Sequence, residues 1–150
     1  MCCFSISEVD NDSLKRKAME ECDSAFTVRV VNRKNYEVLF NKIAHNALFI
    51  VAETRDRDGS SIAGYAALYA NDFSSFEAYI TLICVKKGKQ RSGIGSALMN
   101  HCLKKARERG MHSIRLEVLK EDTGAIAFYE RYGFKVQKEN FGSYYMVRKL

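Results

Sequence analysis

A basic, glycine-containing loop at residues 86–95 is the stretch of the sequence best suited to bind a charged ligand. It follows an apolar, β-branched run at residues 80–85, which predicts a buried strand. Gly93 and Gly95 permit tight backbone geometry at the start of the helix that we expect next. The free N–H groups of a first helical turn and the helix dipole both attract anions. The segment therefore predicts a phosphate-binding site between a strand and a helix.

Three kinds of phosphate-binding loop compete for this segment. A Walker A loop needs Lys and then Ser or Thr after its second glycine, but Ile94 and Gly95 follow Gly93. A dinucleotide-binding fingerprint needs a third glycine three residues after the second, and here a leucine would push helix and strand apart. The pyrophosphate loop of coenzyme A is the favoured interpretation. A nucleotide-binding α/β domain stays as an alternative.

Length, composition and charge exclude several classes of protein. The 150 residues and the ordinary composition predict a single domain spanning residues 1–150. The net charge of +6 suits a polyphosphate ligand, and because no nucleic-acid-binding motif accompanies it we expect no nucleic-acid partner. No apolar run is long enough for a membrane span, and Glu8 and Asp10 argue against a signal peptide. We therefore expect a cytoplasmic protein with no membrane partner.

The cysteines and histidines show no spacing typical of metal ligands, so we expect no metal site. The five cysteines, Cys2 among them, contain no CxxC pair. Cys84 and Cys102 lie in apolar patterns, which predicts that they are buried free thiols.

The elements that must position the loop alternate between strands and helices. We expect, in order, a strand at 4–9, helices at 13–24 and 35–46, a three-stranded antiparallel meander over 48–85, a helix at 93–109, a strand at 114–119, a short helix after Asp122, and closing strands at 135–136 and 144–147. Residues 15–17 (KRK) are predicted to be a solvated helix face, and residues 26–31 fit either a short strand or an extended connection. Gly64 marks a bulge or a close approach of two backbones.

Two segments resemble motifs of the GNAT superfamily of acyl-CoA-dependent N-acyltransferases. Residues 90–95 (QRSGIG) resemble the family's [Q/R]-x-x-G-x-[G/A] loop. Residues 116–118 (LEV) and 125–134 (AIAFYERYGF) resemble its L-E-V … N-x-x-A-x-x-[FL]-Y-x-x-x-G-F pattern. The two motifs also stand in the family's order and at its usual separation. The resemblance covers residues 79–134 as motif and the whole chain as topology.

The resemblance implies an α+β fold, with a mixed, mostly antiparallel sheet of six to seven strands, about four flanking helices and a splayed central strand pair. It implies that acetyl-CoA is the co-substrate and that a primary amine attacks it directly in a ternary complex. The acceptor is a small amine, an amino-sugar or a protein N-terminus, and residues 143–146 (SYYM) resemble members found in surface-polysaccharide contexts, which favours an amino-sugar. Homodimers are common in the family. A non-catalytic CoA-binding or regulatory module of the same fold is the alternative function.

The same resemblance assigns roles to particular residues. Tyr129 matches the general acid that protonates the departing thiolate, with a core aromatic as the competing interpretation. Glu117 and Glu77 are candidates for the general base, beside a water chain, and a structural carboxylate is the competing interpretation for each. The predicted cofactor-binding residues are Ile83, Cys84, Val85, Gln90, Arg91, Ser92, Gly93, Ile94, Gly95, Ser96, Asp122, Thr123, Gly124, Ala125, Phe128 and Arg131. Asp122 stands where the family usually has Asn; it can cap a helix, but when ionised it cannot donate to the pantetheine arm.

Overall fold

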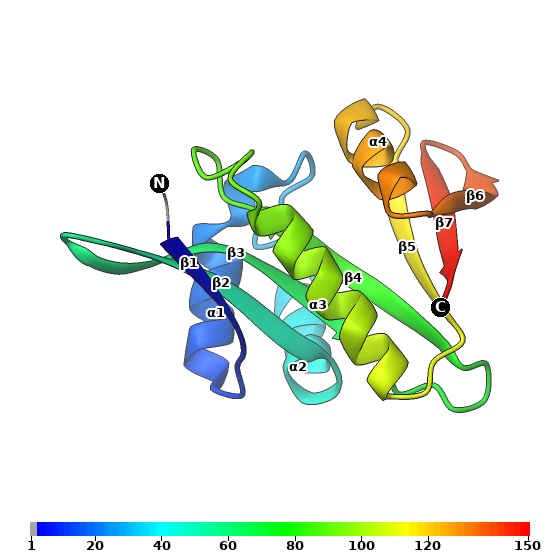
Figure 1. Ribbon diagram of the computed structural model, residues 1–150, viewed down its shortest axis with the longest axis horizontal. Coiled ribbons are helices and arrows are strands. Elements are labelled where there is room, and N and C mark those ends of the chain that lie inside the picture. Colours follow the sequence, from blue (N-terminus) through cyan, green and yellow to red (C-terminus); the bar gives the residue numbers. More distant parts are fainter. Residues whose placement is uncertain (1–2) are drawn as a thin grey trace.

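Seven strands form one mixed sheet in the computed structural model, which describes residues 3–150 (Figure 1). The strands are β1 (Cys3–Glu8), β2 (Leu48–Asp56), β3 (Gly59–Tyr69), β4 (Glu77–Val85), β5 (Ser113–Leu119), β6 (Lys135–Asn140) and β7 (Ser143–Lys149). Their order across the sheet is β1-β2-β3-β4-β5-β7-β6. All neighbouring pairs are antiparallel except β4 and β5, which are parallel. Cys2 lies outside the described residues.

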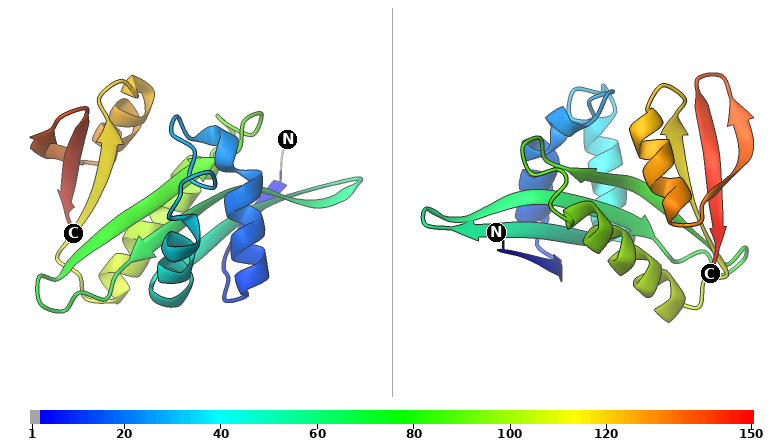
Figure 2. Two further views of the ribbon diagram at one scale, coloured as in Figure 1. Left: turned by 180° about the vertical axis from the view of Figure 1, so that it is seen from behind. Right: turned by 45° about the horizontal axis from the view of Figure 1, so that its top comes forward.

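Helices cover both faces of this sheet. Within residues 3–150 the α-helices are α1 (Asp12–Glu21), α2 (Tyr36–Asn46), α3 (Ile94–Glu108) and α4 (Thr123–Arg131), and a 3₁₀ turn (Asp23–Ala25) follows α1. Helices α3 and α4 lie on the face seen in Figure 1, and α1 and α2 lie on the opposite face, in front of the strands in the left view of Figure 2. This arrangement confirms the predicted α+β fold. No helix in the described part of the chain is long and apolar enough to cross a membrane.

The alternation of side chains along the strands divides the core into two layers. The layer beneath α3 and α4 contains Ile80, Leu98 and Leu116. The layer beneath α1 and α2 contains Phe49 and Tyr65, whose stacked rings have centroids 5.2 Å apart. The central strands β3 and β4 contribute to both layers, so they are anchored on both faces.

Local chemistry sets several helix ends where the sequence predicts them. The Asn11 side chain accepts a hydrogen bond from the Leu14 N–H at 2.9 Å and so caps α1. Gly110 follows α3 with a φ of +78°, the left-handed conformation that commonly ends a helix. Cys84 and Cys102 are buried free thiols, as predicted.

One expectation needs correction, and one alternative that the sequence left open is decided. Lys15 is not on a solvated face: its side chain is buried, and its ammonium donates to the Ala44 carbonyl at 2.9 Å, near the end of α2. A lysine can bury its aliphatic stem and still satisfy helix C-terminal carbonyls, which explains the difference. Residues 26–31 form turns and bends rather than a strand. The buried Asp23 carboxylate accepts hydrogen bonds from the Val30 and Val31 N–H groups at 2.7 and 3.1 Å, and this contact shapes the loop.

Gly64 gives a test of the packing between β3 and β4. A Cβ at this position would lie 2.6 Å from the Cys84 carbonyl oxygen and 3.2 Å from the Val85 Cα, and backbone atoms cannot move aside cheaply. We expect Gly64→Ala to lower the free energy of unfolding by about 1–3 kcal/mol, measured by urea denaturation. Gly124→Ala is the matched control, because no atom lies within 4 Å of its Cβ position. Equal stability of the two variants would contradict the close approach.

Candidate active site

The parallel strands β4 and β5 form a ladder of only four residue pairs, from Glu77 opposite Ser113 to Ile80 opposite Leu116. Beyond this point the two strands diverge, as Figure 1 shows. Each strand keeps its antiparallel partner on the other side, β3 for β4 and β7 for β5. The edge of β4 over residues 81–85 therefore presents backbone N–H and C=O groups toward the gap rather than toward a strand. This is the splayed central pair that the family resemblance implies.

A cleft of about 960 Å³ occupies the gap between the diverging strands. Both motif segments line it, together with the loop that follows α1. The predicted site residues along it are Ile83, Cys84, Val85, Gln90, Arg91, Gly93, Gly95, Ser96, Glu117, Asp122, Gly124, Ala125, Phe128, Tyr129 and Arg131. The fold thus brings together side chains that are up to 48 positions apart in the sequence, from Ile83 to Arg131.

Four predicted site residues do not line this cleft. The Ser92 hydroxyl donates a hydrogen bond to the Lys89 carbonyl, so it stabilises the loop internally. Ile94 is part of the core beneath α3. Thr123 is an exposed residue at the start of α4. Glu77, one of the two candidate bases, lies at the start of β4 and lines a second, smaller cavity instead.

The N-terminus of α3 opens onto the cleft without a side-chain cap from the described residues. Gly93 occupies the cap position with a φ of +86°, and Arg91 also has a positive φ of 65°. The Gln90 side chain donates to the Val85 carbonyl at 3.3 Å and so fastens the loop to the end of β4. The first-turn N–H groups are therefore free to bind an anion, as the sequence predicts for this loop.

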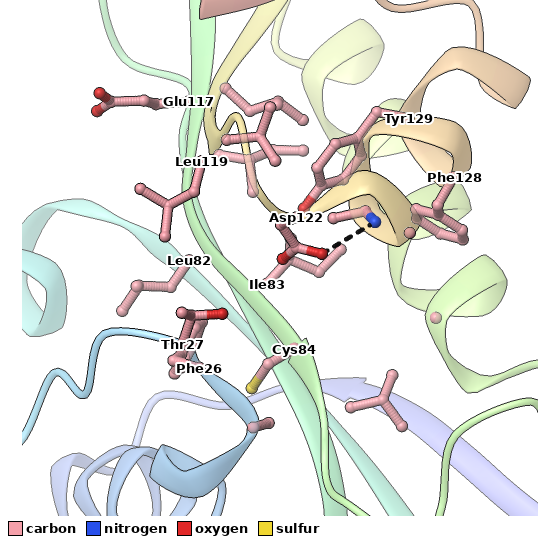
Figure 3. Close-up of a pocket in the computed structure, with 18 of the residues that line it drawn as sticks. Phe26, Thr27, Leu82, Ile83, Cys84, Glu117, Leu119, Asp122, Phe128 and Tyr129 are labelled. Carbon is pink, nitrogen blue, oxygen red and sulfur yellow. Dashed lines mark hydrogen bonds between the residues drawn. The ribbon is translucent and has the colours of Figure 1, made fainter. Parts of the chain in front are cut away.

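Tyr129 approaches the cleft from α4, and its hydroxyl points toward Asp122 in Figure 3. Its ring packs edge-on against Phe128 and Phe134, with centroids 5.6 and 5.9 Å away. Burial, with a smaller contribution from the Asp122 carboxylate, raises the pKa of Tyr129 above that of an ordinary tyrosine. The phenol therefore keeps its proton at neutral pH and is able to donate it.

Asp122 caps α4, because its carboxylate accepts a hydrogen bond from the Ala125 N–H at 3.2 Å. This is the dashed contact in Figure 3. The capping role expected for an Asp at this position is confirmed.

Glu117 projects from the face of β5 that is turned away from α3 and α4. Its neighbours Leu116 and Val118 belong to the core beneath α3 and α4, so the alternation of the strand turns Glu117 away from that core. The side chain is exposed and accepts a hydrogen bond from the Ser143 hydroxyl at 2.6 Å. In Figure 3 its carboxylate points away from Tyr129. A carboxylate and a neutral phenol therefore border the same cleft from opposite faces of the sheet.

The Cys84 side chain is directed away from Tyr129, toward α1 (Figure 3). Its thiol lies near that of Cys22, which is buried at the end of α1, and the two thiols influence each other's pKa. Burial raises the pKa of the Cys84 thiol well above its usual value. A thiol held in its protonated form is a poor nucleophile, so Cys84 contributes its backbone rather than its sulfur to the cleft.

The sequence analysis named no residue of one wall of the cleft. Residues 25–28, Arg33 and Leu39 line it from the side of α1 and α2. Phe26 is held there by an edge-on contact with Tyr65, with ring centroids 6.3 Å apart. The buried Asp23 that organises this loop was a usable signal, since an acidic residue next to an apolar run often caps nearby N–H groups.

Comparisons with known proteins agree with this geometry. The sequence model described as the Acetyltransferase (GNAT) family matches residues 16–134. An uncharacterized N-acetyltransferase of Methanocaldococcus jannaschii is 34% identical over 107 residues, which is 64% of this chain and 47% of that protein. The chain spans less than half the length of the curated relatives that it matches first.

Two solved structures have similar folds. Ard1 from Thermoplasma volcanium superposes with a TM-score of 0.77 and 25% identity, covering 98% of this chain and 97% of that one. The PaiA N-acetyltransferase of Thermoplasma acidophilum, solved in complex with coenzyme A, has a TM-score of 0.76 and 21% identity, covering 99% of both chains. Because the family's sequence model spans most of the chain and the splayed cleft is present, this protein belongs to the GNAT acetyltransferase family.

Proposed function

We propose that this protein transfers an acetyl group from acetyl-CoA to a primary amine by direct attack, with both substrates bound at once. The main observation in support is the cleft between β4 and β5, which is bordered by Glu117 on one face and by Tyr129 on the other. The uncapped N-terminus of α3 opens onto the same cleft. An anion site beside a paired base and acid suits the transfer of an acyl group from a phosphate-bearing donor.

The residues present fit acetyl-CoA. The free N–H groups at the start of α3 and the Arg91 guanidinium suit its pyrophosphate. The unpaired edge of β4 over residues 81–85 suits the amide groups of an extended pantetheine arm, as strand edges bind extended peptides. A protein of the same fold has been solved with coenzyme A, which is consistent with this assignment.

Each side chain then has one task. Acetyl-CoA supplies a thioester, whose carbonyl carbon the amine nitrogen attacks while the carbon–sulfur bond breaks. Glu117 accepts the proton that the amine loses, and Tyr129 donates a proton to the sulfur that departs. The backbone N–H of Ile83 or Val85, which points away from β3, stabilises the negative charge that develops on the carbonyl oxygen, a contribution worth about 3–4 kcal/mol in other acyl-transfer enzymes.

Direct attack is favoured over an acyl-enzyme because the cysteine nearest the cleft is unsuited to the alternative. The Cys84 thiol is buried, its pKa is raised, and its sulfur is directed toward Cys22. An amino-sugar acceptor, a homodimer, a cytoplasmic location and a single domain over residues 1–150 stay predictions from the sequence.

Acetyl-CoA binding is the first measurement. Isothermal titration of the purified protein is expected to show binding of acetyl-CoA, because the helix N-terminus and the strand edge serve different parts of that molecule. ATP and NAD are controls, since they share the adenosine phosphates but lack the pantetheine arm. Binding of ATP and NAD with an affinity equal to that of acetyl-CoA would contradict the proposal.

Replacing Tyr129 tests the general acid. We expect Tyr129→Phe to lower kcat by about 10²–10⁴, because the sulfur then leaves without a positioned proton donor. Acetyl-CoA binding should be retained. Tyr132→Phe is the matched control, since Tyr132 is the C-cap residue of the same helix and does not line the cleft. Unchanged turnover in Tyr129→Phe would remove the main argument for catalysis.

The two candidate bases are separated by a pair of variants. Glu117→Gln is expected to lower kcat/KM by about 10²–10⁴ near neutral pH, because the amide cannot take up the proton. Glu77→Gln should reduce kcat far less, since Glu77 lies outside the cleft and both of its oxygens already accept hydrogen bonds. A larger loss of kcat in Glu77→Gln would reverse the assignment.

A further inference from the structure

A second cavity of about 250 Å³ lies beside the cleft, at the start of β4. Leu39, Tyr79 and Thr81 line both spaces, so the two share a wall. The smaller cavity is on the same face of the sheet as Glu117, because Arg115 and Glu117 are two residues apart on β5. An acceptor with its amine at Glu117 is able to extend into this cavity.

The acidic groups of the second cavity already accept hydrogen bonds from other groups of the protein. The two carboxylate oxygens of Glu77 accept hydrogen bonds from the Arg115 Nε at 3.0 Å and from the Ser113 hydroxyl at 3.4 Å. Asp72 accepts hydrogen bonds from two N–H groups and one hydroxyl of its own loop. Each oxygen of the two carboxylates thus already accepts at least one hydrogen bond from the protein.

Three side chains of the same cavity keep donors without an acceptor among the described residues. Within residues 3–150, the hydrogen bonds of Arg115 use only Nε, and its guanidinium lies 4.6 and 5.3 Å from the ring centroids of Tyr79 and Tyr145. Lys42 forms no ion pair in the described part of the chain; its ammonium lies 5.7 Å from the centroid of the Tyr69 ring. The Tyr69 hydroxyl is buried without a hydrogen-bond partner. Burial raises its pKa, so it stays a donor.

The donors that lack an acceptor indicate which chemical group the second cavity binds. The Tyr69 hydroxyl is a buried donor without an acceptor, which is unfavourable, and the exposed Lys42 ammonium and the partly exposed Arg115 guanidinium present further donors to the same cavity. A carboxylate is small, planar and bidentate, and it matches the two terminal nitrogens of a guanidinium. We propose that this cavity binds a carboxylate of the acceptor, through Arg115, Lys42 and the Tyr69 hydroxyl. The inference rests on the proposed N-acetyltransferase function.

The spacing along β5 limits the distance between the two ends of the substrate. Side chains two residues apart on one face of a strand lie about 7 Å from each other. The substrate class is therefore a small amine whose carboxylate is several bonds away from the reacting nitrogen, as in an ω-amino acid. An amino-sugar meets this requirement only when it also bears an acidic group.

Matched acceptors test the carboxylate directly. 5-Aminopentanoate, 5-aminopentanamide and 1,5-diaminopentane have amines of similar reactivity on chains of equal length, and differ at the far end. We expect the KM of the carboxylate to be at least about tenfold below that of the amide, because charge-assisted hydrogen bonds are stronger than neutral ones. The diamine should have the highest KM, since it places a cation against Arg115 and Lys42.

Variants show whether these residues cause the difference. Lys42→Ala and Tyr69→Phe are each expected to raise the KM for 5-aminopentanoate about three- to tenfold, with kcat and the KM for the amide unchanged. Lys104→Ala, on α3 and with a side chain 70% exposed, is the control for overall charge and should change neither KM. A Tyr69 hydroxyl with only a structural role would leave the KM for 5-aminopentanoate unchanged. Arg115→Gln should show the largest loss of affinity for the carboxylate, but it also unpairs Glu77, so the other two variants decide.

The outcomes separate this inference from the proposed function. Equal KM values for 5-aminopentanoate and 5-aminopentanamide would overturn the carboxylate site and leave acetyl transfer to amines intact. If acetyl-CoA binds but none of the three amines is acetylated, calorimetric titration of 5-aminopentanoate into the coenzyme A complex decides, and absence of binding overturns the inference. Failure of acetyl-CoA itself to bind would contradict the proposed function before this step is reached.

Discussion

The end of the β4–β5 ladder, at Ile80 and Leu116, is the constraint on which the site depends. Each strand is hydrogen-bonded along its outer edge, to β3 or to β7, so neither is able to turn back toward the other. Beyond the divergence, the N-terminal turn of α3 meets α4, and a Cβ on Gly95 would lie only 3.7 Å from the Phe128 ring. The start of α3 thus meets α4 at the Phe128 ring. The cleft follows from the pairing of the strands, together with this contact between the helices.

Position relative to the sheet gives the titratable groups of the cleft different properties. Tyr129 packs into the apolar layer beneath α3 and α4, and burial keeps its proton in place. Glu117 projects from the opposite face, where it is exposed to solvent and bonded to Ser143. An exposed carboxylate and a phenol in an apolar layer suit the proton acceptor and the proton donor of the acyl transfer that we propose. Where we propose that the acceptor binds, the acids of the second cavity accept internal hydrogen bonds, which leaves Lys42 and Arg115 to contact its carboxylate.

Features that depend on a few neighbouring residues were predictable from the sequence. Side-chain periodicity placed the helices and strands, Asn11 and Gly110 marked helix ends, and the glycine loop indicated the start of α3. Features that depend on distant partners were not predictable. Lys15 is buried because a carbonyl 29 residues away accepts a hydrogen bond from its ammonium, and Glu77 is paired with an arginine 38 residues away. The loop over residues 26–31 has no periodicity of its own, because one buried carboxylate sets its shape.

The short ladder between β4 and β5 also divides the molecule mechanically. The strands β1 to β4 form one continuous antiparallel unit, and β5, β7 and β6 form another, joined by four residue pairs and by the contact of the flanking helices. The β4–β5 pair has the fewest paired residues of any neighbouring strands in this sheet, so we expect local unfolding to begin there more readily than within either unit. An extended ligand that hydrogen-bonds along the free edge of β4 takes the place of the absent strand. Such a ligand couples the two folding units, which the chain alone joins by only four residue pairs of the sheet.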